Sequence, residues 1–110
     1  MDRWSVHFVN EEAQREFNAL PVDIKARLVR ILDLFEESGL SALMMPLARP
    51  VHDKIWELRA SGRDGIARSL YVTASVKRLI ILRTFVKKTQ KTPTTEIALA
   101  RKRLGEVIMI

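Results

Sequence analysis

The chain has 110 residues, of which 47% are hydrophobic and 29% charged, with no cysteine and two histidines. This composition fits one globular domain over residues 1–110. The absence of cysteine excludes disulfide scaffolds and thiol nucleophiles, and two histidines are too few to indicate a histidine-based metal cluster. No apolar run approaches the roughly eighteen residues of a membrane span, and polar residues directly follow the first methionine. We therefore expect a cytoplasmic protein.

The net charge of +6 divides unevenly along the chain. Residues 1–48 contain five Lys/Arg and eight Asp/Glu, whereas residues 49–110 contain fourteen Lys/Arg and five Asp/Glu. A basic half of this kind indicates an anionic partner, either nucleic acid or an acidic protein. The alternative is an ordinary solvated basic surface.

The N-terminal part of the sequence predicts a strand followed by two helices. Residues 4–8 alternate as a strand does, and Asn10 is a typical N-cap for a helix that ends before Pro21. A second helix with an apolar stripe follows and ends at Gly39. Residues 40–53 contain two prolines, so we expect an irregular connection there.

A period of two returns in the second half and predicts three antiparallel strands, at 55–59, 66–73 and 79–86. Thr92 and Pro93 fit the cap and first position of a final helix. The order of elements predicts an α+β, two-layer domain with an N-terminal strand, a helical hairpin, an antiparallel meander and a C-terminal helix. The expected core between sheet and hairpin is Leu28, Ile31, Leu32, Phe35, Trp56 and Leu58.

Basic side chains recur on these strands or at their ends, so one sheet can gather them on a single surface. Arg68 shares its face with apolar residues, which predicts either a buried partner or a bulge. Phe85 beside Arg83 is a candidate stacking surface for an RNA base. The basic set that could bind an RNA backbone and stabilise a pentacovalent phosphate is Lys54, Arg59, Arg68, Arg83, Lys87 and Lys88.

Three segments together resemble the HigB-like branch of the RelE/ParE toxin superfamily, which includes the branch first described from phage-derived proteins. They are residues 54–59 (KIWELR), 62–68 (GRDGIAR) and 82–93 (LRTFVKKTQKTP). The similarity runs from about Trp4 to Leu104. It implies a RelE-like fold, with the whole chain forming one toxin domain.

The resemblance also implies a function. Such proteins are toxins of type II toxin–antitoxin modules that cut mRNA on the ribosome, without metal or cofactor, by attack of a ribose 2′-hydroxyl on the adjacent phosphate. It implies two partners, a cognate helix-turn-helix antitoxin and the ribosome with its mRNA, and no membrane. The site residues that it implies are, for catalysis, Lys54, Arg59, Arg68 and Arg83, and, for RNA binding, Phe85, Lys87, Lys88 and Lys91.

One position departs from the family pattern. Relatives often carry histidine in place of Arg83, and an arginine is a poor general base because its pKa is very high. The proton acceptor stays open between Lys54, His52, a ribosomal group and a reaction that relies on geometry and charge alone. Two other functions also stay open, a ParE-like inhibitor of DNA gyrase and an inactive homologue that only binds antitoxin.

Overall fold

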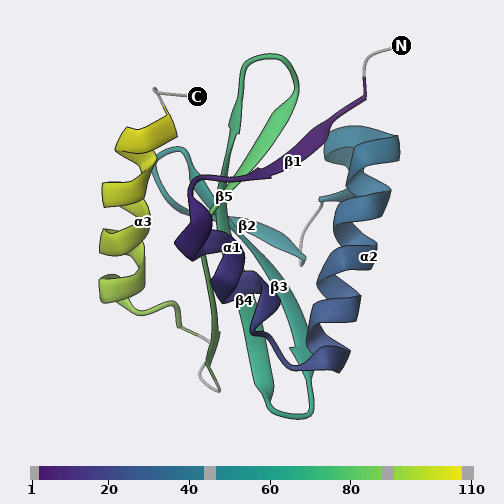
Figure 1. Ribbon diagram of the computed structural model, residues 1–110, viewed down its shortest axis with the longest axis vertical. Helices are drawn as coiled ribbons and strands as arrows, with labels where there is room; N and C mark the ends of the chain where they lie inside the picture. The colour runs from purple at the N-terminus through teal and green to yellow at the C-terminus, as the bar shows by residue number, and fades with distance from the viewer. Residues whose placement is uncertain (1–2, 44–46, 88–90, 108–110) are drawn as a thin grey trace.

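The protein forms one five-stranded sheet with strand order β1-β5-β4-β3-β2 (Figure 1). A computed structural model describes residues 3–43, 47–87 and 91–107. Strand β1 pairs parallel to β5, and the other neighbouring strands pair antiparallel. The strands are β1 Ser5–Phe8, β2 Ala48–His52, β3 Ile55–Gly62, β4 Gly65–Ala74 and β5 Arg78–Lys87. The helices are α1 Glu11–Asn18, α2 Val22–Ser38, the short 3-10 helix Gly39–Ala42 and α3 Thr94–Val107.

Local sequence signals account for the helical hairpin. The Asn10 side chain accepts a hydrogen bond from the backbone N–H of Ala13 at 2.8 Å, which confirms the predicted N-cap of α1. Helix α2 ends at Gly39, whose φ of 73° is a left-handed value that glycine tolerates at a helix end. None of the helices in the described part of the chain is long and apolar enough to cross a membrane.

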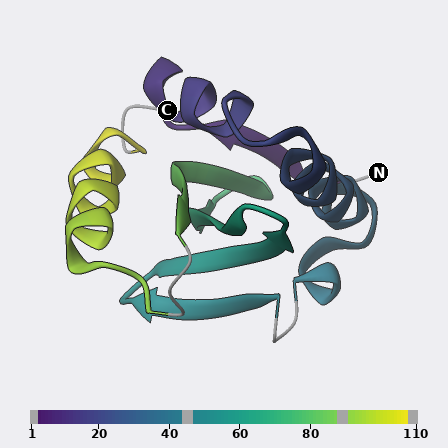
Figure 2. The same ribbon diagram turned by 90° about the horizontal axis from the view of Figure 1, so that it is seen from below.

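Helices cover both faces of the sheet (Figure 2). Along a strand, successive side chains point to opposite faces, so β4 places Leu70 and Val72 on one face and Tyr71 on the other. Leu70 and Val72 pack in a cluster with Ala100 of α3, and Tyr71 packs in a cluster with Phe35 of α2. The α+β class and the predicted order of elements are confirmed, with α3 lying against the face opposite α2.

Residues 48–52 form strand β2, so the prediction of an irregular connection over 40–53 is wrong there. This strand lies at the edge of the sheet and pairs with β3, with an irregular register between Pro50 and His52. Proline is tolerated on an edge strand because its missing N–H need not pair with a neighbour. Five residues that include a proline and an arginine do not show the alternation by which strands are recognised.

Two further predictions need correction. Trp56 is 38% exposed rather than in the core, because a cavity lined by Leu40 and Leu43 leaves its ring partly open. Thr92 does not cap α3 but donates its hydroxyl hydrogen to a carboxylate oxygen of Glu57. The carbonyl of Pro93 instead accepts the N–H of Ile97 at the start of the helix. The other expected core residues are buried, with Ile31 partly buried.

The burial of Phe35 and Trp56 predicts unequal effects of truncation. Phe35 is fully buried, and its ring lies 5.1 Å from that of Trp4. Phe35→Ala should lower the free energy of unfolding by about 3–5 kcal/mol. Trp56→Ala should cost clearly less, because part of its ring already contacts water. Urea unfolding of both variants measures the difference, and equal losses would contradict this assignment of the core.

Candidate functional site

Strand register brings three arginines together on the sheet face that α3 partly covers. Arg59 of β3 lies opposite Arg68 of β4, and Arg49 of β2 lies opposite Glu57 of β3. Residues paired across antiparallel strands share a face, and residues two apart on one strand share it as well. Arg49, Arg59 and Arg68 therefore form what we call the arginine cluster, with Glu57 among them.

Glu57 is fully buried and uses both of its carboxylate oxygens. Oε1 accepts a hydrogen bond from Nε of Arg59 at 2.5 Å, and Oε2 accepts one from the hydroxyl of Thr92. Three guanidinium groups around one carboxylate leave a net charge of +2. A buried carboxylate is tolerated where it is paired and hydrogen-bonded in this way.

Arg68 is the most deeply buried member of the cluster, with 0% exposure. Its Nη1 donates a hydrogen bond to the carbonyl of Lys91 at 3.0 Å. Burial and the positive charges of Arg59 and Arg49 lower the pKa of Arg68, and the negative charge of Glu57 opposes them. The sequence predicts a buried partner or a bulge for Arg68. The structure has the hydrogen-bond partner, and the register of β4 with β5 also shifts nearby, between Leu70 and Tyr71. Gathered positive charge that is partly desolvated is typical of a site for an anionic ligand.

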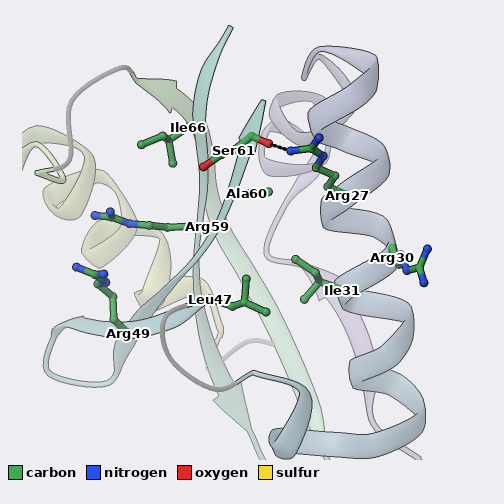
Figure 3. Close-up of a pocket in the computed structure, with 9 residues that line it drawn as sticks. All are labelled: Arg27, Arg30, Ile31, Leu47, Arg49, Arg59, Ala60, Ser61 and Ile66. Atoms are coloured by element: carbon green, nitrogen blue, oxygen red, sulfur yellow. Dashed lines mark hydrogen bonds between the residues drawn. The ribbon is translucent and has the colours of Figure 1, made fainter. Parts of the chain in front are cut away.

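An open cavity of about 550 Å³ reaches this cluster from the edge of the sheet. In Figure 3 the side chains of Arg49 and Arg59 point away from α2, whereas the side chain of Arg30 points away from the other labelled residues. Arg27 donates to the backbone carbonyl of Ser61 on the edge of β3. The residues that line the cavity are Arg27, Arg30, Ile31, Leu47, Arg49, Arg59, Ala60, Ser61 and Ile66.

The buried Nε of Arg49 has no hydrogen-bond partner among the residues that the structure describes. A buried donor without an acceptor is costly, and the Arg49 side chain lines the cavity, where an anion would meet its guanidinium group. The sequence pattern does not indicate Arg49 as a site residue, because the prolines of residues 40–53 predict an irregular connection there. Arg49 lies directly across from the KIWELR strand, and this position would indicate it as a site residue once β2 is recognised as a strand.

Arg83 lies on the same sheet face but belongs to a second ionic network. It pairs with Glu16 of α1 at 2.8 Å and with Glu96 of α3 at 2.7 Å. The hydrogen bond to Glu96 and the charges of both carboxylates raise the pKa of Arg83 against the opposing effect of burial. Arg103 of α3, only 5% exposed, also pairs with Glu16 at 2.8 Å and donates to the carbonyl of Leu82 at 2.9 Å. These contacts tie α1 and α3 to β5.

The structure does not bring Lys54 to the arginine cluster. Lys54 lies in the turn before β3, five positions from Arg59, which corresponds to about 17 Å along an extended strand. His52, the other candidate proton acceptor, lies at the same far end and contacts Asp53 at 3.2 Å. Both line a separate cavity beside Arg101 of α3.

The expected RNA-binding residues have different environments. Phe85 lies opposite Arg68 but is buried, with 7% exposure, and the Arg83 guanidinium is 5.9 Å from the centre of its ring. Lys87 is exposed at the end of β5, and Lys91 is exposed beside the cluster. Lys88 lies outside the described residues. Two exposed lysines thus flank the site, while the ring of Phe85 belongs to the core under α3.

This geometry defines a class of protein: a small α+β domain with arginines on one sheet face beside an open cavity. Residues 15–105 match the family described as phage-derived protein Gp49-like (DUF891), and the chain belongs to that family. No curated protein matches the sequence.

Among the solved structures that share the fold are two toxin structures. A double mutant of the E. coli toxin RelE in the free state is 16% identical, with a TM-score of 0.62 over 94% of this chain and 99% of that chain. RelE in the archaeal RelE–RelB complex from Pyrococcus horikoshii OT3 is also 16% identical, with a TM-score of 0.51 over 83% of this chain and 100% of that chain. The protein therefore has the RelE fold.

The network around Glu16 predicts a loss of stability in acid. Burial alone raises the pKa of Glu16, but the hydrogen bond from Arg103 and the charges of Arg83 and Arg103 together bring it below its ordinary value of 4.5. A carboxyl with a lowered pKa in the folded state adds stability above its ordinary pKa and loses it as pH falls through the folded value. Glu16→Gln should therefore be less stable than wild type at neutral pH, and the difference should shrink below pH 4.5.

Urea unfolding at several pH values measures this difference. Glu11→Gln is the matched control, because Glu11 lies on the same helix, is exposed, and in the described part of the chain pairs with Arg15 at a long 3.7 Å. A Glu16→Gln difference that stays constant from neutral to acid pH would contradict the assignment.

Proposed function

We propose that this chain is the toxin of a type II toxin–antitoxin pair, of the HigB-like branch, that acts in the cytoplasm as a ribosome-dependent mRNA endoribonuclease. The observation that carries the proposal is the arginine cluster beside an open cavity, where the buried Nε of Arg49 has no acceptor among the described residues. The sequence resemblance supports it, since Arg59 and Arg68 belong to two of the segments that resemble HigB-like toxins.

The reaction transfers the phosphoryl group within the RNA strand, from the 5′-oxygen of one nucleotide to the 2′-oxygen of the nucleotide before it. The ribose 2′-oxygen attacks the adjacent phosphorus and loses its proton to a base. The bond from phosphorus to the 5′-oxygen breaks, and this oxygen takes up a proton, which leaves a 2′,3′-cyclic phosphate and a 5′-hydroxyl. Negative charge builds on the non-bridging oxygens in the transition state. Guanidinium groups already in place, as Arg49 and Arg59 are, stabilise that charge without reorganising.

The other predicted residues take different parts in this proposal. Lys87 and Lys91 are exposed and act as counter-charges for neighbouring phosphates. Arg83 is committed to Glu16 and Glu96, so its part is to hold α1 and α3 against the sheet. Catalytic roles for Lys54 and RNA-binding roles for Lys88 and Phe85 stay predictions of the resemblance.

An antitoxin is the second proposed partner. The P. horikoshii RelE of similar fold was solved in complex with RelB, which supports a protein partner for this chain too. A helix-turn-helix antitoxin that brings acidic side chains to the arginine cluster would neutralise its positive charge. Such binding should weaken as salt rises, because salt screens charge pairs.

A homologue without activity that only binds antitoxin is the second candidate function. It is favoured by one observation, that Glu57, the carboxylate within the arginine cluster, is buried and already accepts two hydrogen bonds. Mapping RNA ends on mRNA-programmed ribosomes separates the candidates. New 2′,3′-cyclic phosphate ends support the nuclease, whereas intact mRNA with normal antitoxin binding supports the inactive homologue. Loss of gyrase supercoiling in a parallel assay would instead indicate a ParE-like inhibitor.

Removing one guanidinium from the cluster should slow cleavage strongly. Loss of one donor that stabilises developing charge typically costs on the order of a hundredfold in rate or more. We expect an effect of that size for Arg59→Ala in single-turnover cleavage on programmed ribosomes at saturating protein. Lys102→Ala removes an exposed cation on α3 and is the matched control. Equal rates for the two variants would remove Arg59 from the site.

A further inference from the structure

We propose that Glu57 is a positioning residue: it holds the Arg59 guanidinium for the scissile phosphate and ties the segment Lys91–Thr92 to the arginine cluster. This inference rests on the proposed nuclease function and names the residue that sets the geometry of its site. Glu57 lies within the KIWELR segment, but its alternation with Trp56 and Leu58 alone does not indicate a buried carboxylate.

The first contact fixes the orientation of Arg59. Oε1 of Glu57 accepts from Nε, the inner nitrogen of the guanidinium, at 2.5 Å. Holding the inner nitrogen sets the plane of the group and the direction of its two outer nitrogens as a unit. Arg59 lines the cavity beside Arg49 (Figure 3). A guanidinium fixed at its inner nitrogen has lost its conformational freedom before RNA binds.

The second contact joins the cluster to a distant part of the chain. Oε2 of Glu57 accepts from the hydroxyl of Thr92, which is 35 residues away and lies two residues before the start of α3. The neighbouring carbonyl of Lys91 accepts from Arg68 at 3.0 Å. The segment Lys91–Thr92 is thus held by two members of the site, and it forms part of the cover that leaves Arg68 with no exposed surface.

The charge of Glu57 offsets part of the repulsion among the arginines, but stability alone does not require a carboxylate that holds both Arg59 and Thr92. Glu57 has 0% exposure and lies opposite the apolar Leu70 on β4. Buried ion pairs are often no more stable than apolar residues of similar volume. A carboxylate retained in such a place, in contact with residues that line a cationic cavity, points to a role in arranging them.

This role predicts opposite effects on RNA binding and on cleavage. Glu57→Leu removes the hold on Arg59 and also removes one negative charge, so the cluster's net charge rises from +2 to +3. RNA affinity should therefore be unchanged or higher. The cleavage rate at saturating protein should fall on the order of tenfold to a hundredfold, because the guanidinium is no longer held in position. A general loss of folding would lower binding and cleavage together.

The experiment compares Glu57→Leu and Glu57→Gln with Thr84→Val. Thr84 is the matched control because it makes a buried hydrogen bond with Ser69 at 2.9 Å, outside the arginine cluster. Urea unfolding first checks that each variant is folded, and Glu57→Gln, which keeps the shape and an acceptor oxygen, serves if Glu57→Leu is not. Affinity is measured on ribosomes programmed with mRNA that carries a 2′-deoxyribose at the cleavage site, and rate on the cleavable mRNA.

The expected result is slower cleavage with equal or tighter binding for the Glu57 variants, a smaller loss for Glu57→Gln than for Glu57→Leu, and little change for Thr84→Val. Wild-type cleavage by both Glu57 variants, or a parallel loss of rate and affinity, overturns the inference. If wild type does not cleave, the proposed function fails. Proton exchange at Nε of Arg59, followed by NMR, then decides on Glu57: exchange that is equally fast in wild type and Glu57→Leu overturns its holding role.

Discussion

A buried carboxylate among three guanidinium groups is the contact on which the basic face depends. Like charges on neighbouring strands repel, most strongly where burial lowers the dielectric constant. Glu57 offsets part of that repulsion, and its two oxygens connect Arg59 on β3 with Thr92 before α3. Helix α3 follows Thr92, and its Ala100 packs with Leu70 and Val72 of the sheet. The same carboxylate therefore links the basic site to the apolar packing under α3. Site and core on this face are therefore one connected structure.

Neighbouring acids determine what each arginine of this face does. Glu57, Leu70 and Arg83 lie in one row across β3, β4 and β5, so an apolar residue separates the two ionic networks. In one network, three arginines surround one carboxylate, which pairs with Arg59. In the other, Arg83 and Arg103 share three carboxylates, those of Glu12, Glu16 and Glu96. The first network has an excess of positive charge, which the proposed RNA partner would neutralise, and the second connects helices α1 and α3 to the sheet.

Local sequence patterns predicted the helices and strands well, but they did not predict which side chains from distant segments pair with one another. Asn10 and the alternation of β3 to β5 are local, and each follows from one stretch of chain. The ion pairing of Arg83 depends on Glu16, which is far away in the sequence and contacts Arg83 only in the folded protein. For a related reason Trp56, which is expected in the core, is partly exposed, whereas Glu57 on the other face of the same strand is buried. Helices cover both sheet faces. The alternation of side chains along a strand therefore shows which face a residue is on, but not whether the residue is buried.

The arginine at position 83 also bears on how the proposed reaction handles its proton. Histidine, which relatives often carry at this position, can accept a proton near neutral pH, whereas an arginine held by Glu16 and Glu96 stays charged. Lys54 and His52 lie at the far end of β3 from the arginine cluster, and Glu57 is enclosed. The groups that the described structure gathers at the cavity are thus suited to stabilising phosphate charge rather than to taking up the 2′-hydroxyl proton. A ribosomal group as proton acceptor fits this division, and it would make cleavage depend on the ribosome for chemistry as well as for placement of the mRNA.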